Sequence, residues 1–161
     1  MDDVLKWIIL QPVALVHNAR LVPEDDNWGE VISTIELLPE YPTESLDGLD
    51  AFSHVEVLYY FHQVPAAKVE SAARHPRNNP AWPMVGIFAQ RGKNRPNRVG
   101  ATIARVLRVE GRTLTVAGLD AIDGTPVLDI KPVMCEFLPQ DEVYQPEWVS
   151  ELMIDYWSKP S

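Results

Sequence analysis

The chain has 161 residues, and its 46% hydrophobic and 23% charged residues are typical of a folded globular protein rather than a disordered one. The single cysteine, Cys135, excludes an intramolecular disulfide and any multi-cysteine zinc or iron–sulfur site, and we expect no metal. The formal net charge of −9, taken as an average, argues against a nucleic-acid partner.

Short apolar segments predict strands along the first half of the chain. Residues 7–16 are expected to form a strand pair or a bulged strand that is interrupted at a proline. Residues 30–38 alternate and contain β-branched side chains, which favours a strand. The clearest strand is 54–62, where hydrophobic side chains at every second position share one face. Residues 85–89 predict a short buried strand.

The second half of the chain continues the same pattern. Residues 101–109 and 113–119 are predicted to form two strands of a hairpin, joined by a turn at 110–112. Asp123-Gly124 predicts another turn, and a strand is expected at 127–131.

Few segments favour a helix. Residues 43–48 are expected to form one turn, and 66–74 form a helix in our prediction. Pro146 is suited to the first position of a C-terminal helix, because Val149, Leu152, Met153 and Tyr156 follow with helical spacing. The proline-rich segment 75–83 is a long loop. About seven short strands with few helices predict an all-β fold, either a barrel or a sandwich.

The ends of the chain and its hydrophobic runs are unlike those of a secreted or membrane protein. The first residues, MDDVLK, are acidic where a secretory signal is basic. The early uncharged run between Lys6 and Arg20 is shorter than the about 20 residues that cross a bilayer. We therefore expect a soluble, cytoplasmic protein without membrane contact.

The charges are distributed unevenly along the chain. Residues 68–112 contain ten Lys and Arg side chains against two acids, whereas the rest of the chain contains four against 21. A basic segment of this kind indicates a polyanionic partner, and its excess of arginine favours bidentate contacts with phosphate or carboxylate. The alternative is an arginine-rich surface that pairs with acids from other parts of the fold.

Common nucleotide and metal motifs fail on their spacing. No two of the eight glycines are close enough for G-x-G, and 86–93 has the wrong spacing for a phosphate-binding loop. His54-x-Glu56 lacks the cysteine pair of a zinc deaminase, so a hydrogen-bonded structural role is expected for His54. Asp123 is interpreted as a turn residue.

Three blocks carry a specific resemblance. They are GLDAFSHVEVLYYFHQ at 48–63, GIFAQRGKNRPNRVGATIARV at 86–106 and GLDAIDGTPVLDIKP at 118–132. In order and spacing they resemble the TrmO family, also called TsaA-like or YaeB-like, of S-adenosyl-L-methionine-dependent methyltransferases. The resemblance implies a mainly antiparallel β-barrel over 1–161, with a C-terminal helix and no Rossmann glycine motif. It also implies a homodimer that methylates N6 of threonylcarbamoyladenosine at position 37 of tRNA.

The resemblance also implies a set of cofactor-binding residues, carried over by motif position. They are His62, Gln63, Arg91, Ala101, Ala117, Gly118, Leu119 and Asp120, and, by weaker matching, Asn27, Trp28 and Gly29. From the chemistry of the residues, we expect Arg91 to bind the cofactor's carboxylate and Asp120 its ammonium or a ribose hydroxyl. We assign no catalytic base, because in-line methyl transfer mainly requires alignment and desolvation.

The basic segment then supplies candidates for tRNA phosphates. These are Arg74, Arg77, Lys93, Arg95 and Arg98. An alternative for Arg95-Pro96-Asn97 is a loop that shapes the pocket, and Asp129 and Lys131 are expected to form a structural pair.

The chain departs from the family pattern in three places. Bacterial members often continue into a smaller C-terminal domain, so we expect a short form. Gly92-Lys93 replaces the usual S-P or S-T, and Glu56 replaces a common tryptophan. Two other functions stay open: a methyltransferase of the same fold for a small molecule or another RNA, and a non-catalytic module that binds cofactor or RNA.

Overall fold

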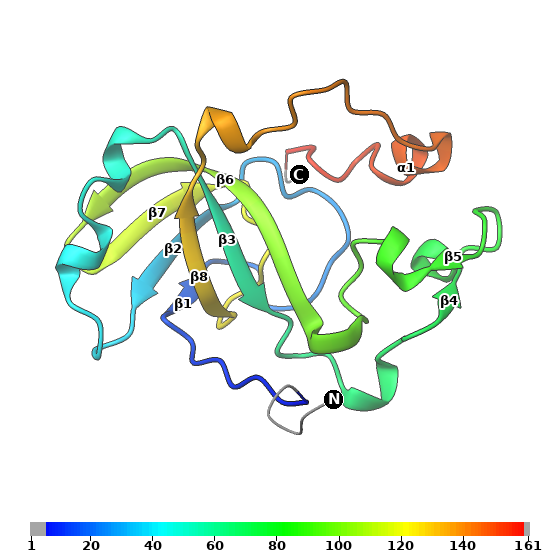
Figure 1. Ribbon diagram of the computed structural model, residues 1–161, viewed down its shortest axis with the longest axis horizontal. Coiled ribbons are helices and arrows are strands. Elements are labelled where there is room, and N and C mark those ends of the chain that lie inside the picture. Colours follow the sequence, from blue (N-terminus) through cyan, green and yellow to red (C-terminus); the bar gives the residue numbers. More distant parts are fainter. Residues whose placement is uncertain (1–5, 160–161) are drawn as a thin grey trace.

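The computed structural model describes residues 6–159, whose main body is a closed β-barrel (Figure 1). Six strands, each antiparallel to its neighbours, form the barrel in the order β1-β2-β7-β6-β3-β8. In chain order they are β1 (Ala14–His17), β2 (Ile32–Leu37), β3 (His54–Tyr60), β6 (Val99–Glu110), β7 (Thr113–Ala117) and β8 (Pro126–Pro132). The prediction of an all-β, mainly antiparallel barrel is confirmed.

The remaining elements lie outside the barrel. Strands β4 (Ala73–Arg74) and β5 (Val85–Gly86) form a separate two-stranded sheet, and α1 spans Glu147–Leu152. Figure 1 shows α1 and this small sheet on the same side of the barrel. Within 6–159, no helix has the length and apolar character needed to span a membrane. The 3₁₀ turns are Thr43–Leu46, Leu49–Ala51, Ala66–Lys68, Pro76–Asn78, Ile87–Ala89, Pro96–Arg98 and Cys135–Phe137.

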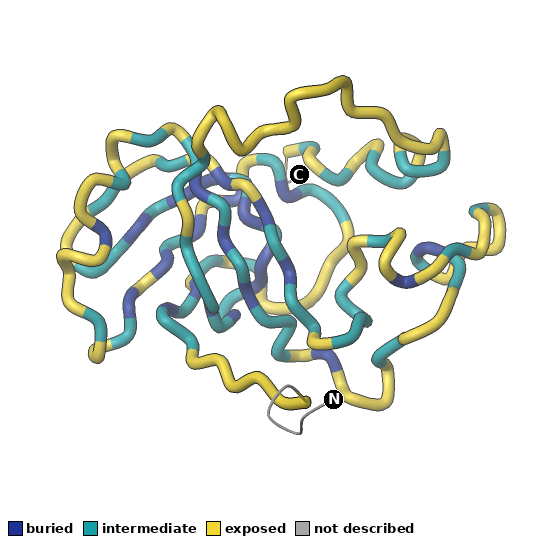
Figure 2. Tube along the Cα trace, viewed as in Figure 1, coloured by how far each residue is buried: buried dark blue, intermediate teal, exposed yellow. Residues whose placement is uncertain are grey.

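The barrel interior is filled by the alternate side chains of its strands. In β3, Val55, Val57 and Tyr59 are buried while the residues between them are half-buried, as the period-2 pattern predicts. Facing side chains from the other five strands complete this core, and Figure 2 shows the buried residues concentrated there. By contrast, residues 134–147 between the barrel and α1 are exposed.

Two predicted turns contain a glycine with positive φ, a backbone conformation that glycine adopts more readily than other residues. Gly111 joins β6 to β7 with φ +58°, and Gly124 precedes β8 with φ +79°. Asp123, just before Gly124, accepts a hydrogen bond from the Asn18 backbone N–H at 3.1 Å. The hairpin at 101–119 and the strand after Asp123-Gly124 are therefore confirmed.

Two predicted strands are shorter than expected, because the neighbouring strands offer them few residues with which to pair. The strand predicted over 7–16 begins only at Ala14. Pairing starts there because Val13 is the first residue whose backbone bonds to the neighbouring strands, donating to the Val127 carbonyl and accepting from the Leu38 N–H. The strand predicted over 85–89 stops at Gly86, because β4 has only two residues to pair with it. The chain then turns at Ile87–Ala89, which leaves the Phe88 side chain 78% exposed.

The helix predicted over 66–74 is a single 3₁₀ turn followed by β4. The Glu70 carboxylate accepts hydrogen bonds from the backbone N–H groups of Ser71 and Ala72, at 2.9 and 2.8 Å. These local bonds replace helical ones, so the helix does not continue. The C-terminal helix is confirmed but is shorter than predicted: Pro146 has an extended backbone and precedes the first helical residue, and Met153 and Tyr156 lie beyond the end of α1 at Leu152.

Candidate functional site

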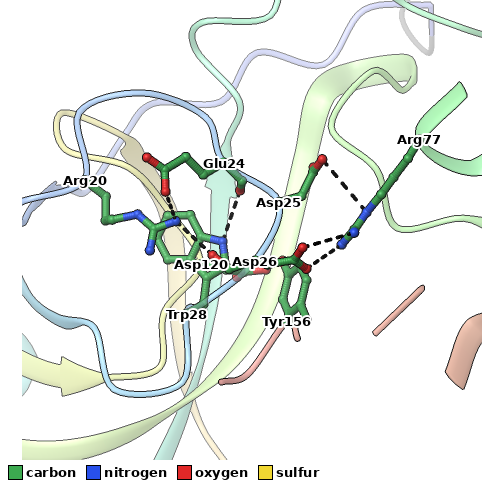
Figure 3. A network of polar contacts seen from close by, with 8 residues as sticks. All are labelled: Arg20, Glu24, Asp25, Asp26, Trp28, Arg77, Asp120 and Tyr156. Carbon is green, nitrogen blue, oxygen red and sulfur yellow. Dashed lines mark hydrogen bonds and ion pairs between the residues drawn. The ribbon is translucent and has the colours of Figure 1, made fainter. Parts of the chain in front are cut away.

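The site is organised around the carboxylate of Asp120, which lies in the loop between β7 and β8. The Tyr59 hydroxyl donates to Oδ1 at 2.9 Å, and the Thr102 hydroxyl donates to the same oxygen. The Tyr156 hydroxyl donates to Oδ2 (Figure 3). Three neutral donors from β3, β6 and the C-terminal segment thus orient the carboxylate without cancelling its negative charge.

Both tyrosines remain hydrogen-bond donors over the physiological pH range. Burial raises the pKa of the Tyr59 hydroxyl well above its usual value, and the charge of Asp120 raises it further. Burial and then Asp120 raise the pKa of Tyr156 in the same way, whereas the nearby Arg91 guanidinium acts in the opposite direction. The Asp120 carboxylate therefore lies among two neutral phenols, with one guanidinium, that of Arg91, nearby.

Arg91 reaches this network from the loop that follows Ile87–Ala89. Its guanidinium donates to the carbonyl of Ala101, the residue before Thr102 on β6. Arg91 is otherwise exposed, so its remaining donors face solvent. The structure therefore brings together Arg91, Ala101 and Asp120, three of the residues that the motif blocks predict.

The predicted residues Asn27, Trp28 and Gly29 contact the C-terminal segment. The Asn27 N–H donates to the Asp155 carbonyl at 3.0 Å, Trp28 to Tyr156 at 2.8 Å and Gly29 to Ser158 at 3.2 Å. Trp28 is buried, its indole N–H donates to the Glu24 carbonyl at 3.1 Å, and the Arg20 guanidinium lies 4.1 Å from its ring centre (Figure 3). The loop is thus held from two sides.

A pocket of about 280 Å³ opens beside this loop, on the outer face of the barrel. It includes the predicted residues Gly29, Ala117 and Gly118. Leu119 belongs to the barrel core, so this position offers backbone rather than side-chain contacts, whereas Ala117 alternates with the core residue Val116 and lines the pocket. The full lining is Gly29, His54, Ile103, Arg105, Ala117, Gly118 and Trp157.

His62 and Gln63 lie just past the end of β3. The built position of a Cβ on Gly124 would lie 3.7 Å from His62 Nε2, so His62 is next to the turn before β8. Gln63 is exposed. Among residues 6–159, no hydrogen bond or ion pair joins either side chain to Asp120. The structure therefore places them at the same strand end but outside the Asp120 network.

Three of the five predicted tRNA-binding cations make contacts within the protein. Arg77 donates to Asp26 at 2.8 Å and lies 3.9 Å from Asp25 (Figure 3). Arg98 donates to the Val64 carbonyl at 2.7 Å.

Arg95 donates to the Gln90 carbonyl at 2.6 Å, which agrees with its alternative role in shaping the loop. The remaining two are Arg74, whose Nε is buried without a hydrogen-bond partner in the described chain, and Lys93, which is half-buried.

The residues interpreted as structural have local partners. His54 Nδ1 lies 2.7 Å from the Ser53 hydroxyl, which supports the hydrogen-bonded role. Lys131 Nζ lies 2.8 Å from Asp129 Oδ2, which confirms that pair, and the Asp129 carboxylate raises the pKa of Lys131. Within 6–159, no group of three or more His, Cys, Asp or Glu side chains is placed to hold a metal ion.

Sequence reasoning missed the three hydroxyl groups around Asp120. Tyr59 carried a usable signal, because a tyrosine on the apolar face of a strand needs a partner for its hydroxyl. Thr102 carried a weaker one as a polar residue on an inward position of β6. Tyr156 carried none, since its helical spacing indicated packing and it lies 36 residues from Asp120.

Comparison with known proteins places this geometry in context. The family model for the tRNA-methyltransferase O N-terminal domain matches residues 16–137. The human tRNA (adenine(37)-N6)-methyltransferase is 41% identical over 105 residues, covering 65% of this chain and 23% of the human protein. A probable S-adenosyl-L-methionine-binding protein of Methanothermobacter thermautotrophicus is 38% identical, over 78% of this chain and 89% of that protein.

A crystal structure of TrmO from Pseudomonas aeruginosa shares the fold, with a TM-score of 0.69 and 29% identity. It covers 86% of this chain, which in turn covers 62% of that structure. The chain therefore spans less than a quarter of the human relative and less than two thirds of the bacterial structure.

Proposed function

The chain belongs to the family of the tRNA-methyltransferase O N-terminal domain, and on that premise we propose that it is an S-adenosyl-L-methionine-dependent methyltransferase acting on N6 of adenosine in tRNA. Relatives are named for that reaction at adenine 37 and for binding this cofactor. The observation that carries the proposal is the Asp120 carboxylate held by hydroxyl donors, with the Arg91 guanidinium bound to the carbonyl of Ala101, the residue before one of those donors, Thr102.

The donor set fits the cofactor's chemistry. S-adenosylmethionine carries an ammonium, a carboxylate, a sulfonium and an adenosine. Asp120 offers an anion for a cationic group, and Arg91 offers free guanidinium donors for the carboxylate. The small residues Ala117 and Gly118 leave room for the adenosine against the backbone. When bound, the cofactor supplies a methyl group activated by the positive charge of the sulfonium.

The chain's own residues then bind, orient and exclude water. Because the Asp120 carboxylate is held by three donors before any ligand arrives, little reorganisation is needed when a cation is placed beside it. Orientation and desolvation are the main requirements of an in-line displacement at a methyl carbon. We propose this mechanism without a base supplied by the residues of the site.

The finer substrate in the proposal is threonylcarbamoyladenosine at position 37, with the enzyme working as a cytoplasmic homodimer. Arg74 and Lys93 are the predicted phosphate contacts left without an internal carboxylate or carbonyl partner in the described chain. The internal contacts of Arg77, Arg95 and Arg98 instead favour the second candidate, a methyltransferase of the same fold with a smaller substrate.

Calorimetry with S-adenosylmethionine tests the cofactor assignment. We expect wild type to bind and Arg91→Ala to bind at least tenfold more weakly, because one charge-assisted contact is lost. Absence of binding by wild type would refute the proposed function.

Analysis of tRNA from a deletion strain tests the substrate. Loss of methylated threonylcarbamoyladenosine supports the tRNA assignment. Its persistence contradicts that assignment and favours the second candidate, a methyltransferase with a smaller substrate. Light scattering of the purified protein tests the dimer.

A further inference from the structure

The C-terminal strap, residues 155–158, follows α1 and lies against the loop at 27–29. Three backbone hydrogen bonds join the two segments, from Asn27, Trp28 and Gly29 to carbonyls of the strap. The strap lies outside the residues 16–137 that match the family model. The family match therefore assigns no role to this segment.

The strap backbone packs closely against the backbone of the loop at 27–29. A Cβ built on Gly29 would lie 1.9 Å from the Trp157 carbonyl oxygen, so only glycine allows this contact. Within α1 itself, the Glu151 carboxylate accepts a hydrogen bond from the Trp82 indole N–H at 2.9 Å. The C-terminal segment therefore contacts the rest of the protein at both α1 and the strap.

Two adjacent residues of the strap contact the Asp120 network and the pocket, respectively. The Tyr156 ring packs against the buried cluster of Trp28, Val31 and Ile122, and its hydroxyl donates to Asp120 Oδ2. Trp157 lines the pocket beside Gly118 and is 46% exposed. The two rings meet edge to face, with centroids 4.9 Å apart, so movement of one ring affects the other.

The geometry points to a working role for the strap in the cofactor site, in which Tyr156 is a positioning residue for the Asp120 carboxylate and Trp157 is an aromatic wall that determines ligand affinity. This inference rests on the proposed function. Tyr59 and Thr102 both donate to Oδ1, so without Tyr156 no other side chain in the described chain donates to Oδ2. The carboxylate is then free to turn away from its ligand-binding orientation.

The test is calorimetry with S-adenosylmethionine on the full chain, at a temperature where each protein is folded. For Tyr156→Phe, which keeps the ring, we expect Kd to rise about tenfold. For Trp157→Ala we also expect a rise of about tenfold, the usual effect of losing an aromatic surface for a base. The matched control is Tyr144→Phe, because Tyr144 is 93% exposed on the same C-terminal stretch.

A second readout separates positioning from packing. A purely structural role would lower the melting temperature of Tyr156→Phe but leave the Kd and the KM for the cofactor unchanged. Cofactor addition is expected to change the fluorescence of wild type, with a smaller change in Trp157→Phe.

If wild type binds the cofactor and both strap variants bind it equally well, the role of the strap is refuted while the proposed function stands. If wild type does not bind, both are refuted. Because Trp157 is partly exposed, its variant keeps the test valid should Tyr156→Phe fail to fold.

Discussion

The contact between Gly29 and the strap yields a sharp prediction for Gly29→Ala. The new methyl carbon would lie 1.9 Å from the Trp157 carbonyl oxygen, far inside the van der Waals limit, and both atoms belong to backbone or are attached directly to it. The strap must therefore move away, and the three backbone hydrogen bonds at Asn27, Trp28 and Gly29 are lost or lengthened. At about 1 kcal/mol each, the free energy of unfolding should fall by about 3 kcal/mol.

Urea unfolding measures this change directly, and hydrogen exchange of the Trp28 amide reports whether the strap has separated. The matched control is Gly86→Ala. Gly86 has an ordinary negative φ, and a Cβ there would lie 4.0 Å from the Ala72 carbonyl oxygen. We expect a change within about 1 kcal/mol for that variant. If Gly29→Ala were as stable as Gly86→Ala and kept its amide protection, the steric reasoning would be refuted.

Other predictions concern charge and titration. The raised pKa values of Tyr59 and Tyr156 mean that their contribution to stability is complete below about pH 10, the unfolded value, and is lost as pH rises through the folded values. Alkaline denaturation should therefore be less steep in Tyr156→Phe than in wild type, and equal profiles would contradict this. Arg98→Ala should destabilise the fold by about 1–2 kcal/mol, because its bond to a backbone carbonyl and its contact with the Tyr60 ring are lost. Lys93→Ala should leave thermal stability unchanged but reduce the salt dependence of tRNA binding by about one phosphate contact, as filter binding at several salt concentrations would measure.

The distribution of charge shows how far sequence reasoning extends. Counting residues located a basic segment at 68–112 in an acidic chain, which the average charge had hidden. Counting did not reveal that Arg77 meets Asp26, 51 positions away, or that Arg95 and Arg98 hold loop carbonyls. Both interpretations of the basic segment were available from the sequence, and only the folded chain shows which arginines already have partners.

The sequence by itself predicted the strand at 54–62 and the hairpin at 101–119, because side-chain alternation and turn glycines act between near neighbours. The structure has these elements at His54–Tyr60 and Val99–Ala117. The sequence also determined the family, since the motif blocks retain their order and spacing. The tertiary structure decided which strands lack partners, as at 7–13, and which distant groups meet. The bond from Tyr156 to Asp120 and the seat of the strap on Gly29 arise from the packing of segments far apart in the chain, which no local pattern encodes.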